Sequence, residues 1–310
     1  MRTVVSINAK GGCGKSTIAM SLAAAFAHRG FKVLLVDMDP QAQLTSWLGA
    51  GDGITDAGTL TSAMAGKQPF ADVISPTEIK NLWFVPASEG LEHLSREMTD
   101  VEGYHVLFAK MLASQAGRFD FCVIDSPNQI SPVMENAIWP ADLFVVPFES
   151  TKAVRSYANF YQLLVKLRPR EAEYPVLHVL SNLSRQTGLR KRVLATMIDH
   201  GIAPAATEIR TCGWLAQVDE NGGDIFAWRP FSFGAADMSQ LTDEVLARLD
   251  ARGGETDAPQ DDIAHVAAAL DLKPLASTDP QSLGTFKLRD DRLIPEAEYQ
   301  PVTPSPELRA

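Results

Sequence analysis

Short apolar runs alternate with longer amphipathic stretches along the first 200 residues of the chain. Apolar runs of this length, rich in Val, Leu, Ile and Phe, are typical of β-strands. Because the runs are apolar on both faces, they favour the interior of a parallel sheet that helices cover on both sides. Strands are accordingly predicted at Thr3–Asn8, Lys32–Asp37, Leu82–Val85, Phe121–Asp125, Leu143–Pro147 and Val176–Leu180.

The stretches between the strands carry apolar residues at helical spacing. Gly30 follows the first of these stretches and fits the left-handed residue that often ends a helix. Alternation of strands and helices predicts an α/β fold with a mostly parallel, twisted sheet. Helices are predicted at Ser16–His28, Gly90–Met98, Val106–Gln115, Ser131–Trp139, Val154–Leu167 and Arg190–His200.

The alternation weakens after about Gly201. Glu208–Thr211 is a candidate last strand, and Gly213–Gly234 is predicted to be loop because turn residues are frequent there. Ala235–Leu249 has the spacing of a closing amphipathic helix. The pattern therefore predicts one catalytic domain over residues 1–252.

The last part of the chain, residues 253–310, has a different composition. Between Ala251 and Ala310, Asp and Glu outnumber Lys and Arg by 11 to 6. We expect a linker at Gly253–Asp262, a short helix at Ile263–Leu270, and an extended or disordered tail from Lys273 onward. This segment is predicted to be an acidic, proline-containing C-terminal extension.

Composition limits the possible locations and partners of the chain, which has 310 residues and a net charge of −10. No apolar run approaches the ~20 residues of a membrane-spanning helix, and the first strand leaves no room for a signal peptide. Cys13, Cys122 and Cys212 lack the spacing of a zinc site or a disulfide framework. We expect a cytoplasmic protein that does not enter membranes and that binds nucleic acid only through a local basic patch.

A glycine-rich stretch, Lys10-Gly11-Gly12-Cys13-Gly14-Lys15-Ser16-Thr17, joins the first strand to the first helix. Glycines at such a junction let several backbone N–H groups point at one anion, and the helix adds its positive end. Lys15 can reach the outer phosphates of a nucleotide, and the Ser16 hydroxyl is placed to ligate Mg²⁺. The stretch predicts a nucleotide-phosphate site with one additional lysine, Lys10, ahead of its glycines.

Carboxylates end two other predicted strands. Asp37 and Asp39 follow the second strand, and Asp125 ends the fourth. Such strand ends face the crevice in which parallel sheets bind ligands. Asp39 there would contact Mg²⁺ or orient the attacking water, and Asp125 would hold the magnesium shell. The alternative for the first pair is that it only begins the turn before Pro40.

Together these motifs resemble the ParA/MinD family of P-loop ATPases. Lys10–Thr17 is similar to the family's deviant Walker A motif KGGxGKS/T, and Asp37–Gln41 matches the DxDPQ of its ParA branch. Phe121–Pro127 resembles the Walker B strand of that branch. The resemblance covers roughly residues 1–250 and implies a P-loop NTPase fold, ATP and Mg²⁺ as cofactors, and slow ATP hydrolysis that a partner protein stimulates.

The resemblance also implies roles for single residues. Lys15 would contact the β- and γ-phosphates, Thr17 the α-phosphate, and Lys10 would reach across a homodimer that sandwiches ATP. Asn182 falls where the family often has an adenine-contacting residue, although a turn at a strand end explains an Asn equally well. The implied catalytic residues are Lys10, Lys15 and Asp39, and the implied metal ligands are Ser16, Asp39 and Asp125.

Among the functions of such ATPases, the motifs favour a ParA-type positioning ATPase whose ATP dimer binds DNA without sequence preference. The candidate for phosphate contacts is the basic cluster Arg185, Arg190, Lys191 and Arg192, with Lys166, Arg168 and Arg170 nearby in sequence, unless these charges belong to ordinary solvated helix faces. Such binding would place the protein on the nucleoid. The motifs leave the cargo open between plasmid, chromosome and protein cluster.

Three alternatives fit less well. Membrane cycling in the manner of MinD needs a basic amphipathic C-terminal helix, whereas residues 282–310 are acidic and broken by prolines. A relative of the nitrogenase iron protein needs a cluster cysteine just past Asp125, where this chain has Ser126-Pro127-Asn128. A metabolic phosphoryl-transfer enzyme is disfavoured because of Lys10 and the DxDPQ element.

Overall fold

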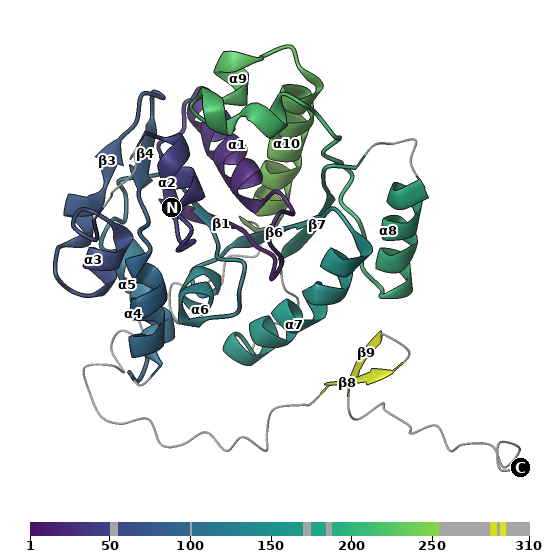
Figure 1. Cartoon of the computed structure of the whole chain (residues 1–310), viewed down its shortest axis with the longest axis horizontal. Coiled ribbons are helices and arrows are strands. Elements are labelled where there is room, and N and C mark those ends of the chain that lie inside the picture. The colour runs from purple at the N-terminus through teal and green to yellow at the C-terminus, as the bar shows by residue number, and fades with distance from the viewer. Residues whose placement is uncertain are drawn as a thin grey trace, which may run out of the picture.

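A seven-stranded sheet forms the centre of the computed structural model, with the strand order β3-β4-β2-β5-β1-β6-β7 (Figure 1). The structure describes residues 1–49, 55–99, 101–169, 175–183 and 188–253, and two short strands near the C-terminus. All neighbours in the sheet pair in parallel except β3, which runs antiparallel to β4. The strands are β1 Arg2–Ser6, β2 Val33–Asp37, β3 Ser75–Pro76, β4 Leu82–Val85, β5 Phe121–Asp125, β6 Leu143–Phe148 and β7 Val176–Leu180. The predicted α/β fold with a mostly parallel sheet is confirmed.

Successive residues of each strand point to opposite faces of the sheet and so divide the core in two. In β2, Leu34 and Val36 belong to one apolar cluster, whereas Val33 and Leu35 belong to the other. All four are fully buried. This explains why the strand sequences lack the alternation of apolar and polar residues that a half-exposed sheet shows.

Helices cover both faces (Figure 1). One cluster packs under α1 Lys15–His28, α2 Gln43–Trp47, α9 Ile225–Trp228 and α10 Phe233–Gly253. The other packs under α3 Leu60–Met64, α4 Gly90–Met98, α5 Leu107–Ala113, α6 Pro132–Ile138, α7 Thr151–Leu167 and α8 Gly188–Asp199. This arrangement leaves the carboxyl ends of β1, β2 and β5 side by side at one edge of the sheet.

Serine caps set the start of two helices. The Ser131 hydroxyl accepts from the backbone N–H of Met134 at 3.3 Å, and the Ser150 hydroxyl accepts from Ala153 at 3.2 Å. Because of the second cap, α7 begins at Thr151 instead of the predicted Val154. Gly30, with φ of 92°, follows the C-cap of α1 as predicted.

Two predictions after Gly201 are wrong. Glu208–Thr211 is not a strand, since Ile209 forms only a single bridge with Ser181. The predicted loop Gly213–Gly234 contains α9 and two 3₁₀ turns, Leu215–Gln217 and Asp219–Asn221. Asp224 explains α9, because its carboxylate accepts from two N–H groups of the first turn.

In the C-terminal extension the structure describes β8 Phe286–Arg289 and β9 Arg292–Pro295, which pair antiparallel in a sheet of their own. The closing helix α10 reaches Gly253, beyond the predicted end at Leu249. The predicted helix at Ile263–Leu270 and the rest of the linker lie outside the described residues.

Candidate nucleotide site

The loop between β1 and α1 has a backbone that requires glycine at two positions. Gly12 and Gly14 adopt φ values of 76° and 95°, in the left-handed region where a side chain is strained. A Cβ on Gly14 would also lie 3.1 Å from the Ser181 hydroxyl oxygen. These glycines let the loop curl over the N-terminus of α1, which begins at Lys15.

Hydrogen bonds within the loop hold its lysines and its cysteine. The Ser6 hydroxyl donates to the carbonyl oxygen of Lys15 at 2.9 Å, and the Lys15 ammonium donates to the carbonyl oxygen of Lys10 at 3.2 Å. The Cys13 thiol contacts the same carbonyl at 3.2 Å, and burial raises its pKa to about 11. The thiol is therefore neutral, and the buried Lys15 supplies the positive charge at the loop.

Asp37 is a structural carboxylate that organises the segment after β2. It accepts from the N–H of Asp39 at 3.0 Å, and from the N–H and hydroxyl of Thr45 at 3.0 and 2.8 Å. Complete burial raises its pKa to about 7, although these hydrogen bonds act in the opposite direction. Asp37 thereby holds both Asp39 and the short helix α2 in place.

Asp39 and Asp125 lie at neighbouring strand ends. Asp39 is 8% exposed, lines a cavity beside the loop, and accepts from the N–H of Gln41 at 3.0 Å. Asp125 is fully buried, and neither of its carboxylate oxygens has a hydrogen-bond partner. Burial, and then the nearby Asp37, raise its pKa well above the usual range, although the Lys15 ammonium and the Ser16 hydroxyl act in the opposite direction. A buried carboxylate without partners is unfavourable, so it is a position at which a cation or its water shell would be stabilised.

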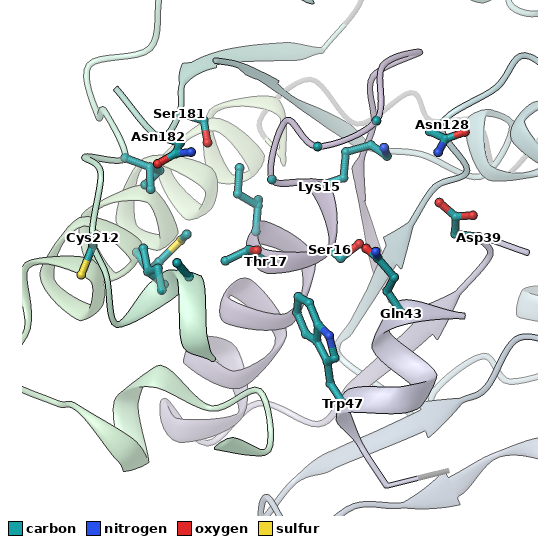
Figure 2. A pocket seen from close by; sticks show the side chains of 18 of the residues that line it. Lys15, Ser16, Thr17, Asp39, Gln43, Trp47, Asn128, Ser181, Asn182 and Cys212 are labelled. Carbon is teal, nitrogen blue, oxygen red and sulfur yellow. The ribbon is translucent and has the colours of Figure 1, made fainter. Parts of the chain in front are cut away.

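A cavity of about 290 Å³ opens between these elements (Figure 2). Lys15, Ser16 and Thr17 from α1 lie along its centre, with Asp39 on one side and Asn182 on the other. Every predicted nucleotide-binding and metal-binding residue except Lys10, Cys13 and Asp125 lines it. The predicted loop, Asp39 and Asn182 therefore come together at one site.

Other cavity-lining residues were not identified from the sequence. Gln43 and Trp47 come from α2, Asn128 from the segment after β5, and Cys212 and Met238 from the C-terminal part of the domain (Figure 2). They belong to segments far apart in the chain and carry no motif. Only the tertiary arrangement brings them beside the phosphate loop.

The residues present fit a nucleotide that brings Mg²⁺ with it. Within the described residues no three His, Cys, Asp or Glu side chains form a preformed metal cluster. Mg²⁺ is commonly held by one or two carboxylates together with substrate phosphates and water, so such a cluster is not required. Ser16, Asp39 and the partnerless Asp125 would be the protein's contribution.

Lys10 has a contact within the chain that the sequence did not predict. Lys10 forms an ion pair with Glu149, which follows β6, and its side chain is 29% exposed. Asn182 adopts a φ of 53° at the end of β7 and also lines the cavity, so the turn and the pocket interpretations both apply. Contact between Asn182 and adenine stays a prediction.

The predicted basic cluster is only partly available for binding. Arg190 makes a bidentate ion pair with Glu208, whereas Lys191 and Arg192 are exposed on α8. Arg185 lies outside the described residues. Across the described helices, none combines the length and the apolar character needed to cross a bilayer.

Comparisons with known proteins agree with this geometry. A protein-family model described as an AAA domain matches residues 1–172. The chain is 34% identical over 148 residues to the chromosome-partitioning ATPase Soj of Treponema pallidum, an alignment that spans 48% of this chain and 57% of Soj. It is 28% identical over 259 residues to the cell division protein PomZ of Myxococcus xanthus, and this alignment covers 80% of this chain and 79% of PomZ.

A solved structure also shares the fold. Apo McdA of Cyanothece superposes with a TM-score of 0.71 at 24% identity, and the match covers 80% of this chain and 99% of McdA. At this identity the likeness establishes the arrangement of the sheet and helices only.

Proposed function

Because this chain belongs to the ParA/MinD-type family of P-loop ATPases, we propose that its ATP hydrolysis controls the positioning or segregation of DNA or of another large intracellular cargo. In this proposal ATP binding joins two copies of the chain, and the dimer binds DNA without sequence preference. A partner protein then stimulates hydrolysis and releases the dimer. The protein would accordingly be found in the cytoplasm, on the nucleoid.

One observation carries the proposal: the phosphate loop, Asp39 and the partnerless Asp125 meet at the carboxyl edge of the sheet. In the proposed complex, the N–H groups of the loop and Lys15 bind the phosphates of ATP. Ser16 and Asp125 support Mg²⁺, and Asp39 orients the attacking water. ATP with Mg²⁺ supplies the phosphoryl group, and the chain's own residues position it.

The dimer is supported by the surplus lysine at the loop. Lys15 already provides a cation for the phosphates, and Lys10 is partly exposed at the surface beside it. Two triphosphates held at one interface need cationic groups from both subunits. We therefore assign Lys10 to the nucleotide of the partner subunit.

The names of the relatives indicate a general role but no particular cargo. Soj of T. pallidum is a chromosome-partitioning ATPase, and PomZ of M. xanthus is a cell division protein. Both names describe proteins that act on large structures inside the cell. We extend that general role to this chain without choosing among chromosome, plasmid and protein cluster.

A gel-shift titration on a duplex of arbitrary sequence tests the DNA step. The full chain should retard the duplex with ATP and Mg²⁺, and bind it much more weakly with ADP or without nucleotide. Binding should weaken steeply with added salt, because phosphate contacts release counterions. Lys15→Gln is the control, since it removes the phosphate-binding ammonium and should abolish the ATP effect. DNA binding that does not depend on the nucleotide, or no DNA binding at all, would contradict the proposal.

A further inference from the structure

The exposed face of α7 consists entirely of hydrogen-bond donors. Lys152, Arg155, Asn159, Gln162 and Lys166 are exposed, and we call them the α7 stripe. Asn and Gln side chains both donate through their amide N–H₂ groups. No Asp or Glu occurs anywhere in the 17 residues of this helix, although the chain has a net charge of −10.

The α7 stripe runs along one side of a helix whose opposite face packs in the core. Spacings of three and four residues place its members within an arc of about 80° and along about 21 Å of the helix. The opposite face of α7 is held in the core by buried residues that include Val154, Phe160 and Leu164. The donors therefore lie in one line on a helix that packs on the core, and Figure 1 shows this helix below the sheet.

The charged residues of the stripe, Lys152, Arg155 and Lys166, have no ionic partner among the described residues. The exposed face of α4 is different, because Arg96 pairs with Glu92 and His93 with Glu97 one turn apart. The exposed face of α4 thus has both acidic and basic residues, whereas the charged residues on the exposed face of α7 are all basic.

The neighbouring helix α8 also exposes basic residues. It packs beside α7 and exposes Lys191 and Arg192. Arg190 is engaged by Glu208 and is less available to an external anion. Among the residues predicted to contact DNA, the structure therefore favours Lys191 and Arg192, and it adds the α7 stripe.

We propose that duplex DNA lies along the α7 stripe, with Lys191 and Arg192 of α8 contacting its backbone beside it. The inference rests on the proposed DNA binding of the ATP dimer and assigns it a surface. A stripe of about 21 Å matches the phosphates of about six base pairs. Lys and Arg neutralise phosphates, and Asn and Gln donate to phosphate oxygens, so the contacts carry no sequence preference.

The test is a fluorescence-anisotropy titration of a labelled 30-base-pair duplex by the full chain with ATP, repeated between 50 and 200 mM salt. Arg155→Gln/Lys166→Gln should lower the affinity roughly tenfold or more and reduce the slope of log K against log salt by about 2. Asn159→Ala/Gln162→Ala should weaken binding severalfold without changing the slope, because it removes uncharged donors.

Lys67→Gln/Lys110→Gln is the matched control, since it removes two exposed charges that belong to neither α7 nor α8. It should leave the slope unchanged. ATP-dependent dimerisation, followed by light scattering, confirms that each variant folds and binds nucleotide.

The outcomes separate the two proposals. Failure of the unmodified chain to bind DNA with ATP overturns the proposed function. Normal binding by the unmodified chain, with an unchanged slope in Arg155→Gln/Lys166→Gln, overturns the α7 stripe and leaves the proposed function standing. An equal loss of slope in Lys67→Gln/Lys110→Gln would also contradict the stripe, because the effect would then follow net charge alone.

Discussion

At the scale of single residues, three carboxylates at the site differ because of their surroundings. Asp37 is saturated with hydrogen bonds from Asp39 and Thr45, so it organises the chain. Asp125 has no partner and is suited to support a cation. Asp39 alone lines the cavity and keeps a small exposed fraction, which suits it for contact with water at the nucleotide.

Asp39→Ala should retain ATP and the dimer but hydrolyse ATP at least about 10²-fold more slowly, because water is no longer oriented. Phosphate release measures the rate, and light scattering with ATP measures the dimer. A variant with normal turnover would refute the role assigned to Asp39.

His178 should make stability sensitive to acid. It lies in β7 between the rings of Phe148 and Tyr157, and Nδ1 contacts the carbonyl oxygen of Ala203 at 3.1 Å. Burial lowers its pKa from 6.5 to about 4. Below pH 6.5 the unfolded chain takes up a proton that the folded chain resists, so the free energy of unfolding falls between pH 6.5 and 4.

The loss attributable to His178 should reach up to about 3 kcal/mol at pH 4. His178→Phe should flatten the dependence of the urea midpoint on pH in this window. His93→Gln, which changes an exposed histidine, is the control and should leave the dependence intact. An identical pH dependence in His178→Phe and in the unmodified chain would rule out this role.

At the scale of elements, α2 connects the site to the rest of the sheet. The Thr45 hydroxyl donates to Asp37 at 2.8 Å and accepts from the N–H of Ala87 at 2.8 Å, which joins β2, α2 and the segment after β4. Trp47, at the end of the same short helix, lines the nucleotide cavity. A five-residue helix is thus held by tertiary hydrogen bonds instead of its own periodicity.

Thr45→Val should lower the free energy of unfolding by about 2 to 4 kcal/mol, because it removes one of the three hydrogen bonds to the buried Asp37 carboxylate and leaves the Ala87 N–H without its acceptor. Urea denaturation measures the change. Thr45→Ser keeps the hydroxyl and should lose about 1 kcal/mol, for the missing methyl group. Equal losses in the two variants would show that the hydroxyl is not the important group.

Buried strands and long helices were predictable from the sequence, whereas the shortest helices were not. Strands β2, β4, β5, β6 and β7 were found to within a residue, because runs that are apolar at nearly every position are a strong local signal. Helices α2, α3 and α9 were missed, since each is too short to show a period.

At the scale of the whole molecule, Lys10 has two possible partners. Within one chain it pairs with Oε1 of Glu149, which also accepts from the Ser150 hydroxyl at 2.9 Å. Oε2 of Glu149 is buried and has no hydrogen-bond partner among the described residues. In the proposed dimer Lys10 contacts the nucleotide of the other subunit. Formation of the dimer would therefore require this ion pair to open.

Glu149→Gln should shift ATP-dependent dimerisation to roughly 30-fold lower protein concentration, because each dimer opens two of these ion pairs and a partly exposed pair contributes ~1 kcal/mol. Light scattering over a dilution series measures the shift. Glu92→Gln removes a carboxylate that pairs with Arg96 on α4 and should have no effect. Weaker dimerisation of Glu149→Gln would mean that the ion pair supports the dimer instead of competing with it.

The sequence by itself determined the fold class, the phosphate loop and the two acidic strand ends, because each depends on residues that are neighbours in the chain. The tertiary structure decided which cations are free and what else lines the site. Arg190 and Lys10 look like available charges in the sequence, and only the folded chain brings Glu208 and Glu149 against them. Conversely, the stripe on α7 becomes a surface only when the core buries the opposite face of that helix. Long-range contacts of this kind leave no local pattern, since the paired residues need only meet in space.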